Sequence, residues 1–329
     1  MISLSSYFEA RRSWSATEYV FWSSLVVLPF VPGVNVPLMM EILIWGLFAL
    51  SLDLLLGFRG LPTLGHAAFF GIGAYTAGLL AKHGWSEPLS GLLGAAAVAG
   101  VIGWLTGRLV AQIHGVALLM ITLGLNLMLA DAALHASTIT GGDDGLQGML
   151  VDPILGLFKF DFAGQTGYYY TLSIVLLVFA MVRALVNSPF GLALIGAREN
   201  PRRMMMLGAS VNSDVSKVFL ISAAIAGVAG GLMAQTTQFV SLESLAFTRS
   251  VDVLVVLVIG GSGYLYGAFL GALVFVGMRD WLAAINPAYW YFWMGLLLVL
   301  IVSFFRKGLF PSLQGMFKRL IVASSKEAS

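Results

Sequence analysis

The sequence predicts an all-α, polytopic membrane protein with about 8–10 transmembrane or re-entrant helices and with both termini on the cytoplasmic side. Two observations indicate this class. Of the 329 residues, 59% are hydrophobic and only 10% are charged, whereas soluble domains carry about 25% charged residues. Apolar stretches also recur along the chain, most of them close to the roughly 20 residues that a helix needs to cross a bilayer. Most of the surface is therefore expected to face lipid.

Eight apolar stretches are each predicted to form one membrane helix. They cover residues 17–34, 38–57, 61–81, 89–107, 116–135, 168–187, 217–238 and 287–305. A further stretch, 250–281, is too long for one helix, and Gly260-Gly261-Ser262-Gly263 lies near its middle. Because glycine weakens a helix and permits a turn, we expect two short helices joined at these glycines.

Lys and Arg residues predict the orientation, since short loops that are rich in them stay cytoplasmic. Arg11 and Arg12 place the N-terminus inside. When membrane crossings are counted from the N-terminus, the basic C-terminal tail lies on the cytoplasmic side only if the 250–281 stretch turns back on itself. It can do so either as a re-entrant pair or as two thin crossings. The predicted organisation is a cytoplasmic N-terminus at residues 1–16, a transmembrane domain at 17–305 with an external loop at 136–167 and a cytoplasmic loop at 188–216, and a cytoplasmic tail at 306–329.

Glycine-rich segments at membrane depth are the first candidate functional feature. Residues 57–78 contain six glycines and a proline, and the glycines at 260–263 lie in the other half of the chain. Irregular backbone leaves amides unsatisfied in hydrocarbon, so it is tolerated only where protein buries it or where it lines an aqueous cavity. Two interrupted segments, one in each half of the chain, are typical of transporters. Close helix packing through small residues is the alternative for any single glycine.

Residues in these segments and in the 116–135 helix are the candidates for lining a solute path. The predicted path residues are Thr63, His66, Phe70, Gly71, Gly73, Tyr75, Thr122, Asn126, Gly260, Gly261 and Gly263. Ionisable residues at membrane depth are few, and each is expected to face the bundle interior or a water-filled path with a partner nearby. They are Glu41, Asp53, His66, Asp131 and Asp252. A place in the headgroup region is the alternative for Asp252.

The motifs of enzymes and metalloproteins are absent from the sequence. There is no cysteine, which excludes thiolate metal sites and cysteine nucleophiles. The histidines lack the HExxH spacing of a zinc protease. No GxxxxGK[ST] string occurs, so the chain has no P-loop for ATP. We therefore predict no catalytic residue, metal or cofactor in this chain, and the formal charge of +2 gives no reason to expect a nucleic-acid partner.

The loop at 188–216 is predicted to contain a short surface helix. Ser188 followed by Pro189 suits a helix start, and Gly208 suits its end. Between them, three consecutive methionines, 204–206, lie beside arginines. Such adaptable apolar surface next to charge is typical of a segment that docks into a groove on another protein. An amphipathic helix lying on anionic lipid is the alternative.

Several spaced motifs in the chain resemble those of the permease subunits of branched-chain amino acid ABC importers, in particular the LivM-like branch. The motifs are GLPTLGHAAFFGIGAYTAG from Gly60, ITLGLN from Ile121, TGGDDGL from Thr140, SPFG and ARENPRRMMMLGAS within 188–210, SAAIAGVAGGL from Ser222 and VIGGSGYLYGAFLGA from Val258. They run along most of the chain in one order. The resemblance implies that residues 17–305 are a permease domain, that 136–167 is a periplasmic loop and that the protein lies in the bacterial inner membrane.

The resemblance also implies partners. A permease of this kind pairs with a second, homologous permease, carries two cytoplasmic ATPase subunits that bind ATP and Mg²⁺, and receives solute from a periplasmic binding protein. It implies that the 188–216 loop is the coupling segment that contacts the ATPase. The residues that the resemblance assigns to coupling are Ser188, Pro189, Phe190, Gly191, Arg198, Glu199, Asn200, Arg202 and Gly208.

The solute that the resemblance implies first is a branched-chain or other hydrophobic amino acid. Some positions depart from the family pattern, such as Leu61-Pro62-Thr63, where many members have glutamine, leucine and serine. Urea, amides and aromatic acids therefore stay open as solutes. A secondary transporter or a passive channel is the alternative outside this class, but the acidic residues at depth are too few and too scattered to predict an ion relay.

Overall fold

The computed structural model describes residues 16–149, 151–154, 156, 158, 161, 164–285, 287, 289–304, 308–312 and 314. Within them there are helices and isolated β-bridges but no β-strand, so the predicted all-α class is confirmed. The basic residues from which the sequence predicts the orientation, Arg11, Arg12 and those of the tail, lie outside the described residues. Which face is cytoplasmic therefore stays a prediction.

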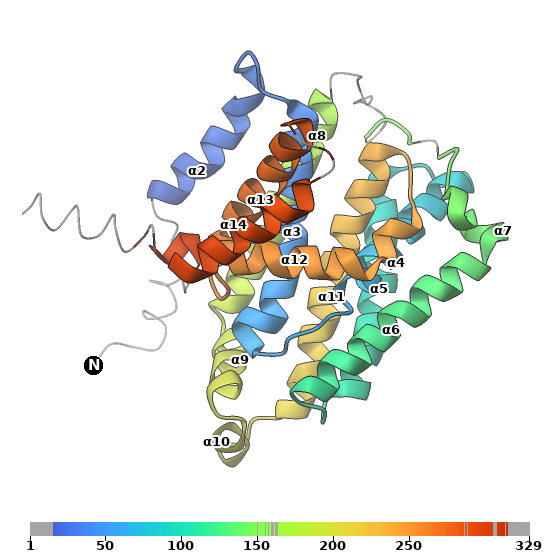
Figure 1. Cartoon of the computed structure of the whole chain (residues 1–329). Helices are drawn as coiled ribbons and strands as arrows, with labels where there is room; N and C mark the ends of the chain where they lie inside the picture. The colour runs from blue at the N-terminus through green and yellow to red at the C-terminus, as the bar shows by residue number, and fades with distance from the viewer. Residues whose placement is uncertain are drawn as a thin grey trace, which may run out of the picture.

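The helices follow one another with mostly short connections (Figure 1). In chain order they are α2 Ala16–Val27, α3 Val36–Asp53 with a π-helical turn η2 Leu54–Arg59, α4 His66–Lys82, α5 Pro88–Val110, α6 Val116–His135, α7 Ser137–Thr140, α8 Gln165–Val186, α9 Pro189–Glu199, α10 Pro201–Met206, α11 Val211–Thr237, a 3-10 turn η4 Leu242–Leu245, α12 Phe247–Gly260, α13 Leu265–Ile285 and α14 Trp290–Phe304.

In the described part of the chain, six helices are long and apolar enough to cross a membrane: α3 with η2, α5, α6, α8, α11 and α13. The other predicted membrane elements form shorter helices, α2, α4, α12 and α14. The predicted division of 250–281 is confirmed, because α12 ends at Gly260 and α13 begins at Leu265. The chain is thus a multi-pass membrane protein.

Helices α3 and α11 form the centre of the bundle. In their most apolar windows, 78% of α3 with η2 and 72% of α11 are buried, against 17% of α6. Helix α11 packs along α5, α4 and α3. Figure 1 shows α6 along one edge of the molecule, and α9 and α10 together at one end. The exposed apolar surface of α6 is thus available to lipid or to another subunit.

The predicted interruption across residues 57–78 is wrong in its second half. The chain is irregular from Gly60 to Gly65, but α4 then continues as a regular helix through Gly71, Gly73 and beyond. A Cβ atom at Gly73 would overlap the backbone of Gly227 on α11. Gly73 therefore lets α4 and α11 approach closely, which agrees with the alternative of helix packing through small residues.

Candidate functional site

The two glycine-broken segments meet at the end of α3. The Asp53 carboxylate, which is fully buried, accepts a hydrogen bond from the backbone N–H of Gly263 at 2.7 Å. A Cβ atom at Gly57 would overlap both Asp53 Oδ1 and the Gly263 amide. The residues that join α12 to α13 are therefore seated directly against the η2 turn, although they lie some 200 positions further along the chain.

Helix α9 reaches the same place. The Arg198 guanidinium donates a hydrogen bond to the Gly57 carbonyl oxygen and interacts electrostatically with Asp53. Its aliphatic stem lies over Gly60, where an added Cβ would come within 2.7 Å of Arg198 Cγ. We call Asp53, Gly57, Arg198 and Gly263 the junction. It connects both irregular segments to the predicted coupling loop.

Backbone conformation explains why glycine stands at the α12–α13 turn. Gly261 and Gly263 have φ angles of +104° and +84°, a region that side chains with a Cβ rarely adopt. Gly260 has an ordinary φ, but a Cβ there would overlap the Gly267 carbonyl oxygen. The turn is thus specified by backbone geometry and close approach.

Three buried polar side chains satisfy backbone groups of the irregular segments and of the start of α4. Thr122 Oγ1 accepts from the Leu64 amide at 3.2 Å, and Asn126 Nδ2 donates to the Leu245 carbonyl at 3.0 Å. Ser250 Oγ on α12 accepts from the Ala67 amide at 2.9 Å. Because hydrocarbon offers no partner to these groups, such bonds are needed to keep non-helical backbone in the membrane. No local sequence pattern indicates this role of Ser250.

Ser250→Ala is expected to destabilise the protein by about 1–3 kcal/mol, because it leaves the Ala67 amide buried without an acceptor. Ser173→Ala is the matched control, since among the described residues the Ser173 hydroxyl donates only to the Tyr170 carbonyl of its own helix. Thermal unfolding in detergent measures both. Equal melting temperatures for the two variants would contradict the role of Ser250.

His66 begins α4 and is completely buried. The Ser51 hydroxyl, which has one proton, donates to the Phe48 carbonyl at 2.6 Å, so His66 Nε2–H donates to Ser51 Oγ at 2.7 Å. The imidazole stacks on the Phe48 ring at 5.4 Å. His66 thus ties α4 to α3, and the partner expected for this residue is Ser51.

Four predicted path residues each retain a buried polar atom without a hydrogen-bond partner among the described residues. These atoms are Thr63 Oγ1, His66 Nδ1, Tyr75 Oη and Asn126 Oδ1. Thr63 and Thr122 line a cavity of about 10 Å³, which has room for about one water molecule. Among the described residues, the cavity beside Thr63 and Thr122 is therefore too small for a solute.

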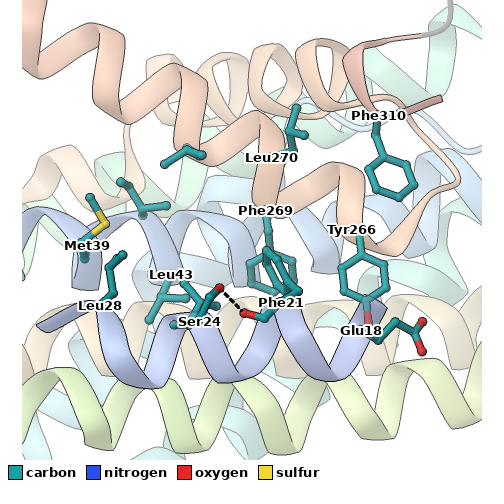
Figure 2. A pocket seen from close by; sticks show the side chains of 13 residues that line it. Glu18, Phe21, Ser24, Leu28, Met39, Leu43, Tyr266, Phe269, Leu270 and Phe310 are labelled. Atoms are coloured by element: carbon teal, nitrogen blue, oxygen red, sulfur yellow. Dashed lines mark hydrogen bonds between the residues drawn. The ribbon is translucent and has the colours of Figure 1, made fainter. Parts of the chain in front are cut away.

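Larger cavities lie elsewhere. One of about 530 Å³ lies between α2, α3 and α13. Figure 2 shows Phe21, Tyr266 and Phe269 around it, with Glu18 at one end. Its lining is almost entirely apolar, so a polar solute would lose hydrogen bonds with water on entering. Another, of about 490 Å³, lies beside the start of α8 and is lined by Tyr169, Tyr170 and neighbouring residues. Neither contains a predicted path residue.

The predicted coupling loop forms two helices, so the expectation of a single helix is wrong. Ser188 Oγ accepts from the Gly191 amide at 3.5 Å and starts α9, as expected. Asn200 is extended, with φ −152°, because it precedes Pro201. Its side chain accepts from the Arg203 amide at 3.0 Å and starts α10. Gly208, with φ +86°, ends the segment as expected.

The remaining coupling residues occupy two sides of these helices. Gly191 is buried, and a Cβ there would overlap the Val186 carbonyl. Arg198, Glu199 and Arg202 are exposed. Beyond them Met206 is 84% exposed and Leu207 74%. The segment therefore presents an apolar, uncovered end at α10, while α9 carries Arg198 of the junction.

A match to a protein-family model identifies the family of this chain. The model described as "Branched-chain amino acid transport system / permease component" matches residues 36–302. The chain belongs to this family. The permease is 31% identical over 295 residues to the high-affinity branched-chain amino acid transport system permease protein LivM of Escherichia coli, with 82% of this chain and 68% of that protein covered. No solved structure matches it.

The permease also resembles both kinds of subunit found in one archaeon. It is 28% identical to the probable LivM protein of Methanocaldococcus jannaschii over 284 residues, covering 74% of this chain and 80% of that one. It is 27% identical to the probable LivH protein of the same organism over 240 residues, covering 71% and 75%. The higher identity and longer match are to LivM, in agreement with the resemblance in the sequence motifs.

Proposed function

We propose that this permease is the membrane-spanning subunit of an ATP-binding cassette importer that brings branched-chain or other hydrophobic amino acids across a bacterial inner membrane. Family membership supports the class of protein, and the names of the LivM relatives support the solute. The chain has no P-loop sequence, so ATP and Mg²⁺ would be bound by separate ATPase subunits. The remaining proposed partners are a second permease and a periplasmic binding protein.

A second permease subunit is needed to complete the solute path. The cavity beside Thr63 and Thr122 holds only about one water molecule. Helix α6, which carries Thr122 and Asn126, exposes Met120, Leu127 and Met128 on its other side. A homologous subunit packed against this part of the bundle would enclose a path between the two chains. The matches to both LivM and LivH proteins support such a pair.

The junction is the observation that carries the mechanism. When two ATPase subunits close on ATP, they would push on α9 and α10. Arg198 would pass this displacement to Gly57, and Asp53 would pass it to Gly263, because these contacts link α9, η2 and the α12–α13 turn. Packed helices that move as rigid bodies about such turns would then open the path alternately to each side.

Met206→Asp is expected to weaken co-purification of the ATPase subunits by about tenfold, because the exposed apolar end of α10 would then place a charge in the interface. Met206→Leu is the matched control and keeps apolar contact. Pull-down of tagged permease from mixed detergent micelles, with the ATPase quantified, measures the effect. Equal recovery with both variants would contradict the docking role.

Uptake by reconstituted vesicles tests the function. Vesicles would contain the permease, its partner permease and the ATPase subunits, with the binding protein and labelled leucine on the outer side. ATP-dependent accumulation that excess isoleucine and valine suppress is the expected result. If only urea, amides or aromatic acids suppressed uptake, that compound would be the solute in place of a branched-chain amino acid. Accumulation without ATPase subunits would show a transporter of another class.

A further inference from the structure

A charged cluster at membrane depth lies apart from the junction. The Arg249 guanidinium carbon on α12 is 5.3 Å from the ring centroid of Trp45 and 5.3 Å from that of Phe70. Both rings are buried, on α3 and α4 respectively. A cation in this position is attracted to the ring faces, yet Arg249 itself is only partly buried. Its guanidinium is thus held in a defined place while part of it stays accessible.

The start of α12 lies beside the start of α4. Ser250, next to Arg249, accepts the hydrogen bond from Ala67 in the first turn of α4, and Figure 1 shows α12 running across α3 toward α4. Two helices therefore begin at the same level, inside the span that α3 crosses without interruption. In transporters, solute sites lie near the bilayer midplane where helices are discontinuous.

The charges around Arg249 fall into two groups. Glu41 and Arg279 are satisfied, since Glu41 Oε1 accepts from Arg279 Nη2 at 2.6 Å and from Trp45 Nε1 at 3.3 Å. Arg249 and Asp252 interact electrostatically with each other and with Glu243, but within the described residues neither makes an ion pair or a side-chain hydrogen bond. Among the described residues, a cation and an anion thus remain without an ion-pair partner on one helix.

The spacing places these two charges side by side. Asp252 follows Arg249 by three positions, and side chains at that spacing are neighbours on a helix surface, about 5–6 Å apart at Cβ. Both are partly exposed. An α-amino acid carries its carboxylate and its ammonium group on one carbon atom. Opposite charges on adjacent turns are therefore complementary to such a solute, provided that each faces its counterpart.

We propose that Arg249 and Asp252 bind the two charged groups of a zwitterionic α-amino acid during transport, Arg249 taking the carboxylate and Asp252 the ammonium group. This inference rests on the proposed function. The planar guanidinium offers two parallel donors that match a carboxylate. The buried Phe70 and Trp45 rings beside Arg249 hold its guanidinium in place. Of these residues, only Phe70 is among the path residues that the sequence predicts.

Leucine uptake by vesicles that contain the complete importer and its binding protein tests the proposal. Arg249→Gln and Asp252→Asn are each expected to raise the leucine concentration at half-maximal uptake by at least about tenfold, with ATP hydrolysis and subunit assembly close to wild type. Arg249→Lys should retain part of the affinity because it keeps the charge. Arg108→Gln is the matched control, since Arg108 is exposed and also lies over a tryptophan ring, 4.6 Å from the centroid of Trp104.

Each outcome separates the proposal from its alternatives. The proposal would be overturned if the leucine concentration at half-maximal uptake were unchanged in Arg249→Gln or in Asp252→Asn. The proposal would also be overturned if Arg249→Gln and Arg249→Lys both failed to assemble with the other subunits while near-isosteric Asp252→Asn kept wild-type affinity for leucine. Arg249 would then have a structural role only. Wild-type vesicles that accumulate no amino acid would refute the proposed function, and the zwitterion site with it.

Discussion

Arg198→Ala is expected to lower ATP-driven uptake by about tenfold or more while ATP hydrolysis by the assembled importer stays near wild type. The Arg198 guanidinium is the contact between α9 and the Gly57 carbonyl, and its stem covers Gly60. Removing it leaves the proposed ATPase docking surface on α10 intact but disconnects that surface from η2. Coupling free energies between sites are typically about 1–3 kcal/mol, which corresponds to about 5- to 150-fold.

The ratio of solute imported to ATP hydrolysed, measured in the same vesicles, is the quantity that reports this effect. Arg108→Ala is the control for loss of an exposed arginine, since Arg108 lies on α5, which contributes no residue to the junction. Its ratio should equal that of wild type. A ratio that does not change in Arg198→Ala would show that displacement reaches the helices by another route.

Gly230→Ala is expected to destabilise the permease by about 3 kcal/mol or more and to reduce sharply the yield of folded protein. A Cβ atom there would overlap the Phe70 carbonyl oxygen and come within 3.0 Å of the Ala74 amide. Both contacts are backbone atoms of α4, so no side chain can move aside and α4 and α11 must separate. Overpacking of this kind typically costs about 1–3 kcal/mol, occasionally more.

Gly277→Ala is the matched control because nothing lies within 4 Å of an added Cβ at that position on α13. In a regular helix with free space, replacing glycine by alanine instead stabilises the folded protein by about 0.4–1 kcal/mol, because it lowers the conformational entropy of the unfolded chain. The two substitutions add the same methyl group and should therefore shift the melting temperature in opposite directions. Size-exclusion profiles and thermal unfolding in detergent measure both. A shift of the same sign and size would contradict the close α4–α11 crossing.

Sequence reasoning predicted the helices well because hydrophobic length is a strong signal in membrane proteins. The turn at 260–263 was predictable from the same signal, since the apolar stretch 250–281 is too long for one helix and three of its residues 260–263 are glycines. The glycines within α4 were ambiguous, because a glycine that breaks a helix and one that lets helices touch look alike in a single sequence. At Gly73 the structure distinguishes them, because the backbone of Gly227 on a distant helix lies against this glycine.

The junction was not predictable in the same way. Asp53 was identifiable as a carboxylate that needs a partner at membrane depth, but its partner is the Gly263 amide, 210 positions away. Arg198 was assigned to coupling by resemblance alone, and its bond to Gly57 depends on where α9 packs. Local patterns thus indicate which groups are expensive to bury, whereas tertiary packing decides what satisfies them.

Hydrogen exchange of the assembled importer, with and without a non-hydrolysable ATP analogue, tests most directly whether α9 and both irregular segments respond as one unit. Amide protection at residues 57–65 and at 260–263 is expected to change together when the nucleotide binds, and Arg198→Ala should abolish the change in both segments while leaving that in α9 and α10. A nucleotide-dependent change confined to α9 and α10 in the wild-type importer would contradict transmission through the junction.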